Sequence, residues 1–255
     1  MHFPFILVNT EESLRNAVLE LSRFTEIAFD SEGVSLSRSG TMTVAIFLGI
    51  TPPKEQSPAY VVDVQTLGGA AAFKTGLGKI LESRQIRKIT FDCRSDSDAL
   101  FHQYGYFLNH VLDMQVYEQA VRFINGEPLP NSTTYINGKR RVPFVRGMSQ
   151  LSKQYIDTAT LQALGGSADN GPHKTDPLVW QKRPLALKSI QYAANDAFIT
   201  RELLFAFRNH DVPRYLMNGV FAHSERYTRH LRDILTPATF ASDKYYIMEE
   251  ISILK

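Results

Sequence analysis

Residues 26–33 read Glu-Ile-Ala-Phe-Asp-Ser-Glu-Gly, an apolar run that ends in two acids, Asp30 and Glu32. Side chains two residues apart on a β-strand point to the same face of a sheet. A strand over 26–30 therefore presents both carboxylates side by side at its end. Crowded carboxylates disfavour ionisation, and a divalent cation is the usual group that stabilises them. The stretch predicts a buried strand that carries a metal site.

Further strands and helices surround this run in a mixed order. Short gaps containing Gly and Pro separate the strand-like runs 26–30, 42–48 and 60–64, which favours an antiparallel meander. Other strands are expected at 5–8 and 88–91. Hydrophobic periodicity predicts helices at 11–24, 70–81, 95–104, 148–156, 185–208 and 212–235, and 111–124 begins as a strand and continues as a helix. This order predicts an α/β fold, with one mixed sheet flanked by helices.

Bulk properties exclude several classes of protein. The chain has 255 residues and a net charge of +2, which neither demands nor excludes a nucleic-acid partner. Cys93 is the single cysteine, so an internal disulfide and a cysteine-rich zinc site are excluded, and a buried core thiol is expected. No apolar run approaches the ~20 residues that cross a bilayer, and the start lacks signal-peptide features. We therefore expect no membrane partner and an intracellular location, cytoplasmic or nuclear; protein partners stay unknown.

A third acid follows the predicted strand at 88–91. The segment 92–98 reads Asp-Cys-Arg-Ser-Asp-Ser-Asp and leads from that strand into a helix. Asp96 falls in the first helical turn, where it can serve as a metal ligand or as a helix cap. Asp92 and Asp98 are competing candidates from spacing alone.

The long helix near the end of the chain carries the motif Tyr192-Ala-Ala-Asn-Asp196. Residues four apart share a helix face, so the phenol and the carboxylate lie side by side. Together with Asp30, Glu32 and Asp96, these residues can build a two-metal site. Oxygen ligands suit Mg²⁺ or Mn²⁺. Two such ions about 4 Å apart can activate a water and stabilise the leaving oxygen of a phosphoryl displacement.

The sequence Asp-x-Glu, then a central Asp, then Tyr-x-x-x-Asp resembles the DEDD superfamily of 3′-5′ exonucleases. The match is to the tyrosine subclass, the group of ribonuclease D and Werner-type exonucleases. The histidine subclass has His five residues before the last Asp, and Gln191 stands there in this chain. The motifs at 113–115 and 180–185 add to a resemblance that covers about 24–207.

This resemblance implies a ribonuclease H-like fold, to which the residues themselves add an inserted hairpin and a C-terminal helical extension. We expect an exonuclease domain at 1–210, with its core at about 24–207, and the extension at 211–255. The metal ligands for two Mg²⁺ or Mn²⁺ ions would be Asp30, Glu32, Asp96 and Asp196, and Tyr192 would orient the attacking water. The implied activity is release of nucleoside 5′-monophosphates from the 3′ end of single-stranded RNA or DNA, with RNA favoured.

Residues 125–147 depart from the family pattern and are rich in Pro and Gly. Within them, 133–142 predicts a hairpin closed by Asn137-Gly138. Basic side chains with aromatic neighbours suit single-stranded nucleic acid, although a solvated basic loop is the plainer alternative. The candidate substrate-binding residues are Lys139, Arg140, Arg141 and Arg146, together with His173 in the polar segment 165–177.

Two other functions remain open from the sequence. Some exonuclease-like relatives have lost acids and bind RNA as adaptors, whereas this chain keeps all five motif residues. A structural subunit would need an exposed apolar stripe on the last helix, for which Leu216, Val220 and Tyr227 are candidates.

Overall fold

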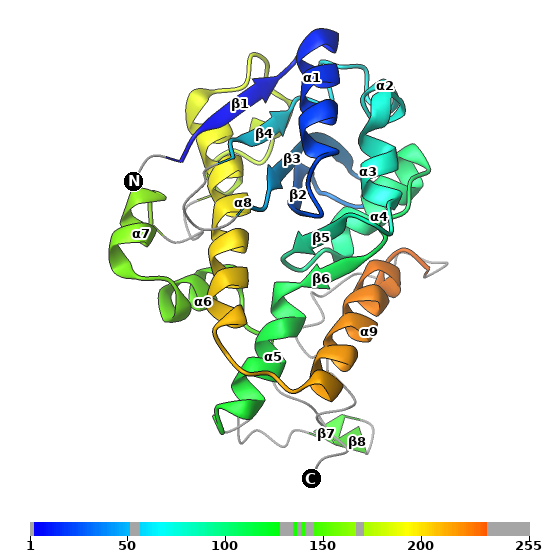
Figure 1. Ribbon diagram of the computed structural model, residues 1–255. Coiled ribbons are helices and arrows are strands. Elements are labelled where there is room, and N and C mark those ends of the chain that lie inside the picture. Colours follow the sequence, from blue (N-terminus) through cyan, green and yellow to red (C-terminus); the bar gives the residue numbers. More distant parts are fainter. Residues whose placement is uncertain are drawn as a thin grey trace.

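The computed structural model describes residues 3–51, 57–127, 135–136, 139–140, 145–166 and 171–233. A six-stranded sheet lies at its centre, with the strand order β1-β4-β3-β2-β5-β6 (Figure 1). The strands are β1 (Phe5–Val8), β2 (Glu26–Val34), β3 (Thr41–Gly49), β4 (Ala59–Val62), β5 (Arg87–Thr90) and β6 (Val111–Asp113).

The pairing of the strands confirms the mixed sheet. β3 pairs antiparallel with β2 on one side and with β4 on the other, which is the expected meander. The outer strands join in parallel, β1 beside β4, β5 beside β2 and β6 beside β5. Parallel neighbours require crossover connections, and helices supply them here.

Strand β2 is longer than its apolar run predicts. The strand was expected to end at Asp30, but it continues to Val34 because β3 pairs with it as far as Thr41. A bulge interrupts the register between Glu32 and Gly33. A β-carbon at Gly33 would lie 1.9 Å from the carbonyl oxygen of Thr41, so only glycine fits this close approach.

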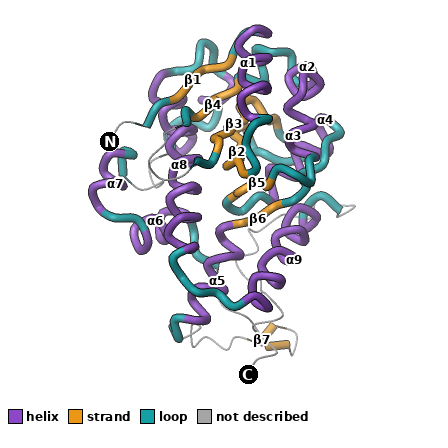
Figure 2. The backbone as a smooth tube through the Cα atoms, viewed as in Figure 1, coloured by secondary structure: helices purple, strands orange, loops and turns teal. Residues whose placement is uncertain are grey.

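Helices pack around the strands (Figure 2). Most match the expected ranges to within a few residues, and α7 was not expected. The longer helices are α1 (Glu11–Leu21), α4 (Arg94–Tyr104), α5 (Met114–Ile124), α6 (Met148–Tyr155), α7 (Thr158–Ala163), α8 (Leu187–Arg208) and α9 (Arg214–His230). Two single 3₁₀ turns, η3 (Pro172–Lys174) and η4 (Val179–Gln181), precede α8.

The helix expected over 70–81 is present but interrupted. It consists of α2 (Ala70–Ala72), a π-helical turn η1 (Phe73–Leu77) and α3 (Gly78–Glu82). Gly76 causes the break, because its φ of 142° lies outside the helical region. A β-carbon at Gly76 would also lie 2.6 Å from Cγ1 of Val18 on α1.

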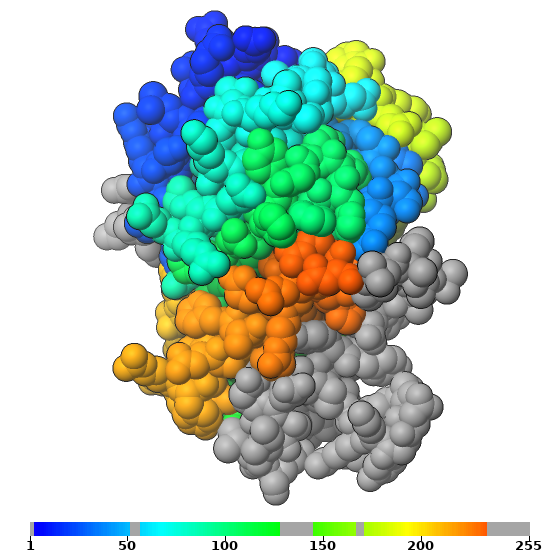
Figure 3. All heavy atoms as spheres, turned by 90° about the vertical axis from the view of Figure 1, so that its right-hand side faces the viewer, coloured from blue at the N-terminus to red at the C-terminus, as the bar shows by residue number. Residues whose placement is uncertain are grey.

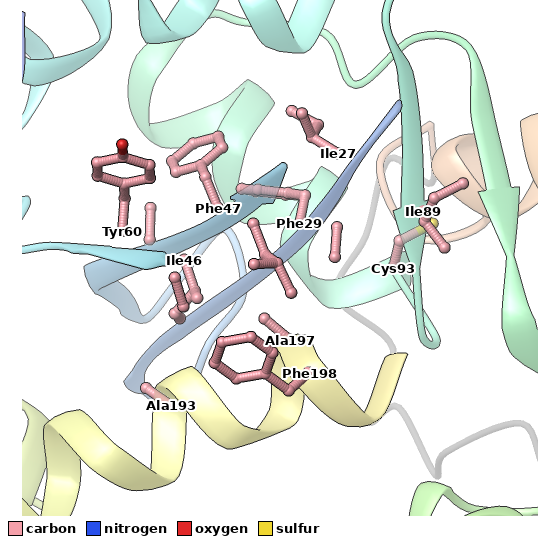
Figure 4. Packing of buried hydrophobic residues seen from close by; sticks show 14 of the residues in the cluster. Ile27, Phe29, Ile46, Phe47, Tyr60, Ile89, Cys93, Ala193, Ala197 and Phe198 are labelled. Carbon is pink, nitrogen blue, oxygen red and sulfur yellow. The ribbon is translucent and has the colours of Figure 1, made fainter. Parts of the chain in front are cut away.

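Helix α8 crosses one face of the sheet and packs most extensively against β2. Ala193 and Ala197 lie one turn apart on the buried side of α8, beneath β2 (Figure 4). Small side chains let a helix approach a strand closely. Phe29 stacks on Phe47 of β3 at 5.3 Å between ring centroids, which fills the core beside this contact. The close approach of α8 to β2 sets the position of the functional site.

Helix α9 packs against β6, α4 and α5 (Figure 3, orange). Leu216, Val220 and Tyr227 are fully buried there and do not form an exposed apolar stripe. The hypothesis of a structural subunit required an exposed apolar stripe on this helix, and these three residues do not provide one. The division of the chain at residue 210 stays a prediction.

The expected hairpin is confirmed as a pair of short strands, β7 (Tyr135–Ile136) and β8 (Lys139–Arg140), which pair antiparallel. Its turn at 137–138 and residue Arg141 lie outside the described residues, as do the side chains of Lys139 and Arg140. Within the described ranges, no helix combines the length and the apolar character that crossing a bilayer requires.

Candidate active site

Strand β2 supplies two carboxylates. Because side chains alternate along a strand, Asp30 and Glu32 share the face of β2 that α8 covers. They lie opposite Ile46 and Val44 of β3, inside the paired strand rather than beyond its end. Both side chains are half-buried. The antiparallel pairing with β3 therefore holds the backbone of both residues rigidly.

Helix α8 supplies a third carboxylate and a phenol. Tyr192 and Asp196 lie on one face of the helix, and the Tyr192 hydroxyl donates a hydrogen bond to Asp196. One carboxylate oxygen each from Asp30, Glu32 and Asp196 lie within 4.8 Å of one another. Residues separated by more than 160 positions in the sequence thus meet in one cluster.

The fourth acid approaches from the other side of β2. Asp96 lies in the first turn of α4, as expected, and is buried. Its Oδ1 accepts a 2.5 Å hydrogen bond from the hydroxyl of Ser31, which alternation places on the opposite face of the strand from Asp30 and Glu32. Asp96 is therefore next to the three-carboxylate cluster without being one of its members.

The competing acids near Asp96 are occupied by arginines. The Asp92 carboxylate accepts hydrogen bonds from Arg94 at 2.5 and 2.7 Å. The Asp98 carboxylate binds the side chain and the backbone N–H of Arg38, with distances of 2.6 to 3.0 Å. Both acids thus have structural partners, which leaves Asp96 as the candidate ligand of this segment.

The carboxylates of the site resist ionisation. Burial, and next the charge of Asp196, raise the pKa of Asp30 to about 8. Burial and the neighbouring Asp30 raise the pKa of Glu32 well above its usual range, and the same two causes raise that of Asp96. Burial raises the pKa of Asp196 to about 7, although the hydrogen bond from Tyr192 opposes this shift.

A divalent cation fits this donor set. Among the described residues, no Lys or Arg lies within ion-pair distance of Asp30, Glu32 or Asp196. Three carboxylates that lack a cationic partner would repel one another once ionised. Mg²⁺ and Mn²⁺ prefer carboxylate oxygens, and binding would compensate the charge that burial disfavours. The chemistry of the side chains therefore matches the metal expected from the sequence.

The segment before α8 packs closely against the Tyr192 side chain. The His173 ring lies edge-on to the Tyr192 ring, with 6.3 Å between centroids, and Trp180 lies at the same centroid distance. A β-carbon at Gly171 would lie 3.0 Å from the Tyr192 hydroxyl oxygen and 2.4 Å from Cε1 of His173. Gly171 therefore leaves room for both side chains, and His173 stands beside the site.

Arg146 has a different environment from the one expected of a substrate contact. Its guanidinium pairs with Glu118 and Glu127, each at 2.9 Å, and donates a further hydrogen bond to Gln154. This network ties residues 145–147 to α5. A role of Arg146 in substrate binding, like that of Lys139, Arg140 and Arg141, stays a prediction.

Sequence reasoning missed two residues at the site. Ser31 was visible only as the middle residue of Asp-x-Glu, and alternation predicts that it points away from the acids. Its contact with Asp96 depends on the position of α4, which no local pattern encodes. Gly171 lies in a polar segment with no periodicity, and its proximity to Tyr192 depends on how η3 packs against α8.

A family model described as 3′-5′ exonuclease matches residues 5–210. The chain belongs to the 3′-5′ exonuclease family. The match includes every acid of the cluster, Asp96 and Tyr192.

Solved structures are similar in fold to this chain. The ribonuclease D of Trypanosoma brucei in its complex with GMP has a TM-score of 0.73 and 25% identity, covering 98% of this chain and 70% of that chain. The same enzyme in complex with RNA U12 has a TM-score of 0.70 and 25% identity, covering 98% of this chain and 79% of that chain.

Among curated proteins, the mouse piRNA biogenesis protein EXD1 is 37% identical over 100 residues. The aligned region is 39% of this chain and 16% of the mouse protein. Across the curated relatives, the shared part spans between 16% and 38% of their length. The chain therefore matches less than half the length of each of these curated relatives.

Proposed function

We propose that this chain is a metal-dependent 3′-5′ exonuclease that shortens single-stranded nucleic acid, with RNA preferred over DNA, and releases nucleoside 5′-monophosphates. The observation that carries the proposal is the cluster of Asp30, Glu32 and Asp196, whose oxygens lie within 4.8 Å of one another. Such a cluster costs folding free energy unless a cation binds there, so its presence favours a catalytic site over a purely structural one.

In this proposal Asp30, Glu32, Asp96 and Asp196 hold two divalent cations, Mg²⁺ or Mn²⁺. When bound, the cations supply a more acidic water and stabilise negative charge on the leaving oxygen. Ser31 binds one oxygen of Asp96 and leaves the second oxygen as the ligand. The protein positions these ligands on a paired strand and two helices, so little reorganisation accompanies the reaction.

Tyr192 orients the attacking water through its hydroxyl. Burial and the neighbouring Asp196 raise the pKa of Tyr192, so the phenol stays neutral at physiological pH and acts through hydrogen bonding. Water adds to the terminal phosphorus, and the bond to the 3′ oxygen of the preceding nucleotide breaks. That oxygen takes up a proton and becomes the new 3′ hydroxyl, while the nucleotide leaves as a 5′-monophosphate.

The preference for RNA rests on similarity. The solved complexes of Trypanosoma brucei ribonuclease D contain GMP and RNA U12, and the curated relatives are piRNA biogenesis proteins. An RNA substrate accords with the expected cytoplasmic or nuclear location. The exonuclease domain is proposed to occupy 1–210, and residues 211–255 to form an extension that begins with α9.

Cleavage of 5′-labelled oligonucleotides tests the proposal. RNA and DNA strands of equal sequence are incubated with Mg²⁺ or Mn²⁺ and resolved by length. We expect a ladder that shortens from the 3′ end, faster on RNA and absent in Asp30→Asn. The matched control is Asp211→Asn, which neutralises an exposed carboxylate outside the site and should cleave like the wild type. Tight RNA binding without cleavage under either metal would instead support an RNA-binding adaptor.

A further inference from the structure

A line of three polar side chains runs along α8. Lys188, Tyr192 and Asp196 are spaced four residues apart, so they lie on one face of the helix. Each step covers roughly 6 Å along the helix axis. Lys188 is exposed, Tyr192 is half-buried and Asp196 is buried. The line therefore leads from solvent to the carboxylate cluster, with Lys188 at the outer end.

The residues that the structure describes show no structural role for Lys188. Across the described ranges, no carboxylate lies within ion-pair distance of its ammonium group. Lys188 is the second residue of α8, and the first turn contains no acid. The positive end of the helix dipole disfavours a cation at this position. A lysine in the first turn therefore lowers the stability of α8. Binding of a negatively charged ligand is the simplest reason for a lysine at position 188.

The segment before α8 lies beside the Tyr192 part of this line. Turn η3 packs against α8, and the exposed His173 lies edge-on to Tyr192. His173 and Lys188 are both exposed, and Tyr192 lies between the exposed end of this line and the carboxylate cluster. A strand whose terminal phosphate reaches the cluster and that runs outward along this line would bring an upstream phosphate to Lys188.

We propose that Lys188 binds a backbone phosphate of the single-stranded substrate, upstream of the phosphate that is cleaved. This inference rests on the proposed exonuclease function and adds to it a site for a second phosphate. A lysine ammonium binds phosphate as a mobile point charge, which suits a flexible single strand of any sequence. Binding at Lys188 would hold the remaining strand after each terminal nucleotide leaves.

Fluorescence anisotropy with 5′-labelled RNA tests this site. The protein carries Asp30→Asn so that the RNA stays intact. The RNA strands differ in one neutral methylphosphonate linkage, placed in turn at each of the last four positions. Lys188→Ala is compared with Lys188→Arg, which keeps the charge, and with Lys74→Ala, which removes an exposed lysine on η1, away from α8.

With Lys188 present, one neutral linkage near the 3′ end should weaken binding roughly 3–10-fold. Lys188→Ala should bind weaker by a similar factor and become insensitive to that same linkage. Its slope of log affinity against log salt should become shallower by about 0.7, the value for one phosphate contact on a single strand. Lys188→Arg should keep the sensitivity, and Lys74→Ala should match the parent.

An unchanged linkage profile and salt slope in Lys188→Ala would overturn the Lys188 site. If the wild type nevertheless shortens RNA from the 3′ end with Mg²⁺ or Mn²⁺, the exonuclease proposal survives and only this inference fails. Absence of both cleavage and oligonucleotide binding in the wild type would contradict both proposals.

Discussion

The Ser31 hydroxyl and the Asp96 carboxylate share a 2.5 Å hydrogen bond that joins β2 to the first turn of α4. Ser31 lies between the two acids of β2 but points to the other face of the sheet. The bond therefore connects the strand that carries Asp30 and Glu32 to the helix that carries the fourth acid. Both partners are buried, so neither can exchange this bond for water without a cost.

Ser31→Ala should destabilise the protein. The substitution leaves the buried Asp96 oxygen without its donor, which we expect to lower the free energy of unfolding by about 1–3 kcal/mol. Chemical denaturation without metal measures the change. Ser31→Thr keeps the hydroxyl and should lose less. Equal stability of Ser31→Ala and the wild type would show that the bond does not hold Asp96.

The metal-free protein should lose stability as the pH rises. Folding raises the pKa of Asp30 to about 8 and that of Asp196 to about 7, from an ordinary value of 3.8. The folded state therefore binds protons more tightly than the unfolded state. The stability that this proton binding contributes is complete below pH 3.8 and is lost as the pH rises through 7 to 8. Melting temperatures in EDTA should fall between pH 6 and pH 8.5, and Mg²⁺ should restore them at the upper end. A flat or rising profile in EDTA would contradict the raised pKa values.

Asp30→Asn should stabilise the metal-free protein while abolishing cleavage. The amide removes one charge from three crowded carboxylates, so at pH 8 in EDTA we expect a melting temperature roughly 2–4 °C above that of the wild type. Differential scanning calorimetry measures this shift. Asp211→Asn, on the surface, should leave the melting temperature unchanged. A lower melting temperature for Asp30→Asn would mean that the Asp30 carboxylate stabilises the fold, which would contradict its role as a metal ligand.

Gly171→Ala should slow cleavage without unfolding the protein. The added methyl group would meet the Tyr192 hydroxyl at 3.0 Å and the His173 ring at 2.4 Å, so one of these side chains must move. We expect the cleavage rate to fall roughly 10-fold or more, because displacement of a positioning group by about 1 Å is costly. Gly147→Ala is a suitable control, since a β-carbon there meets nothing within 4 Å. Equal rates for Gly171→Ala and Gly147→Ala would show that the close approach of Gly171 to Tyr192 and His173 does not affect cleavage.

Much of the fold was readable from the sequence, because hydrophobic periodicity and turn residues encode local structure. The meander, the first turn of α4 and the long helix α8 were expected from such signals. The extension of β2 past Asp30 was not, because pairing with β3 carries the strand through a polar stretch. The break at Gly76 was missed for a similar reason, since a single glycine within a helical pattern has more than one outcome.

The candidate site, like the fold, was only partly predictable from the sequence. The motif residues Asp30, Glu32 and Asp196 were identified in advance, and the cluster depends on α8 lying close beneath β2. Ion pairs across the fold were not predictable. Arg146 was proposed as a substrate contact, which stays a prediction, but its ion pairs with Glu118 and Glu127 from other segments were not expected. Long-range partners of this kind leave no local pattern.

Titration of the protein with Mn²⁺, followed by the electron paramagnetic resonance signal of the free ion, examines whether Asp30 and Asp196 share a cation. We expect saturable binding by the wild type and similar affinity in Tyr192→Phe, which keeps every carboxylate. Asp196→Asn and Asp30→Asn should each bind Mn²⁺ at least about 10-fold more weakly, since each removes one ligand of the same ion. Wild-type affinity in Asp196→Asn would contradict a shared metal site, and with it the proposed nuclease.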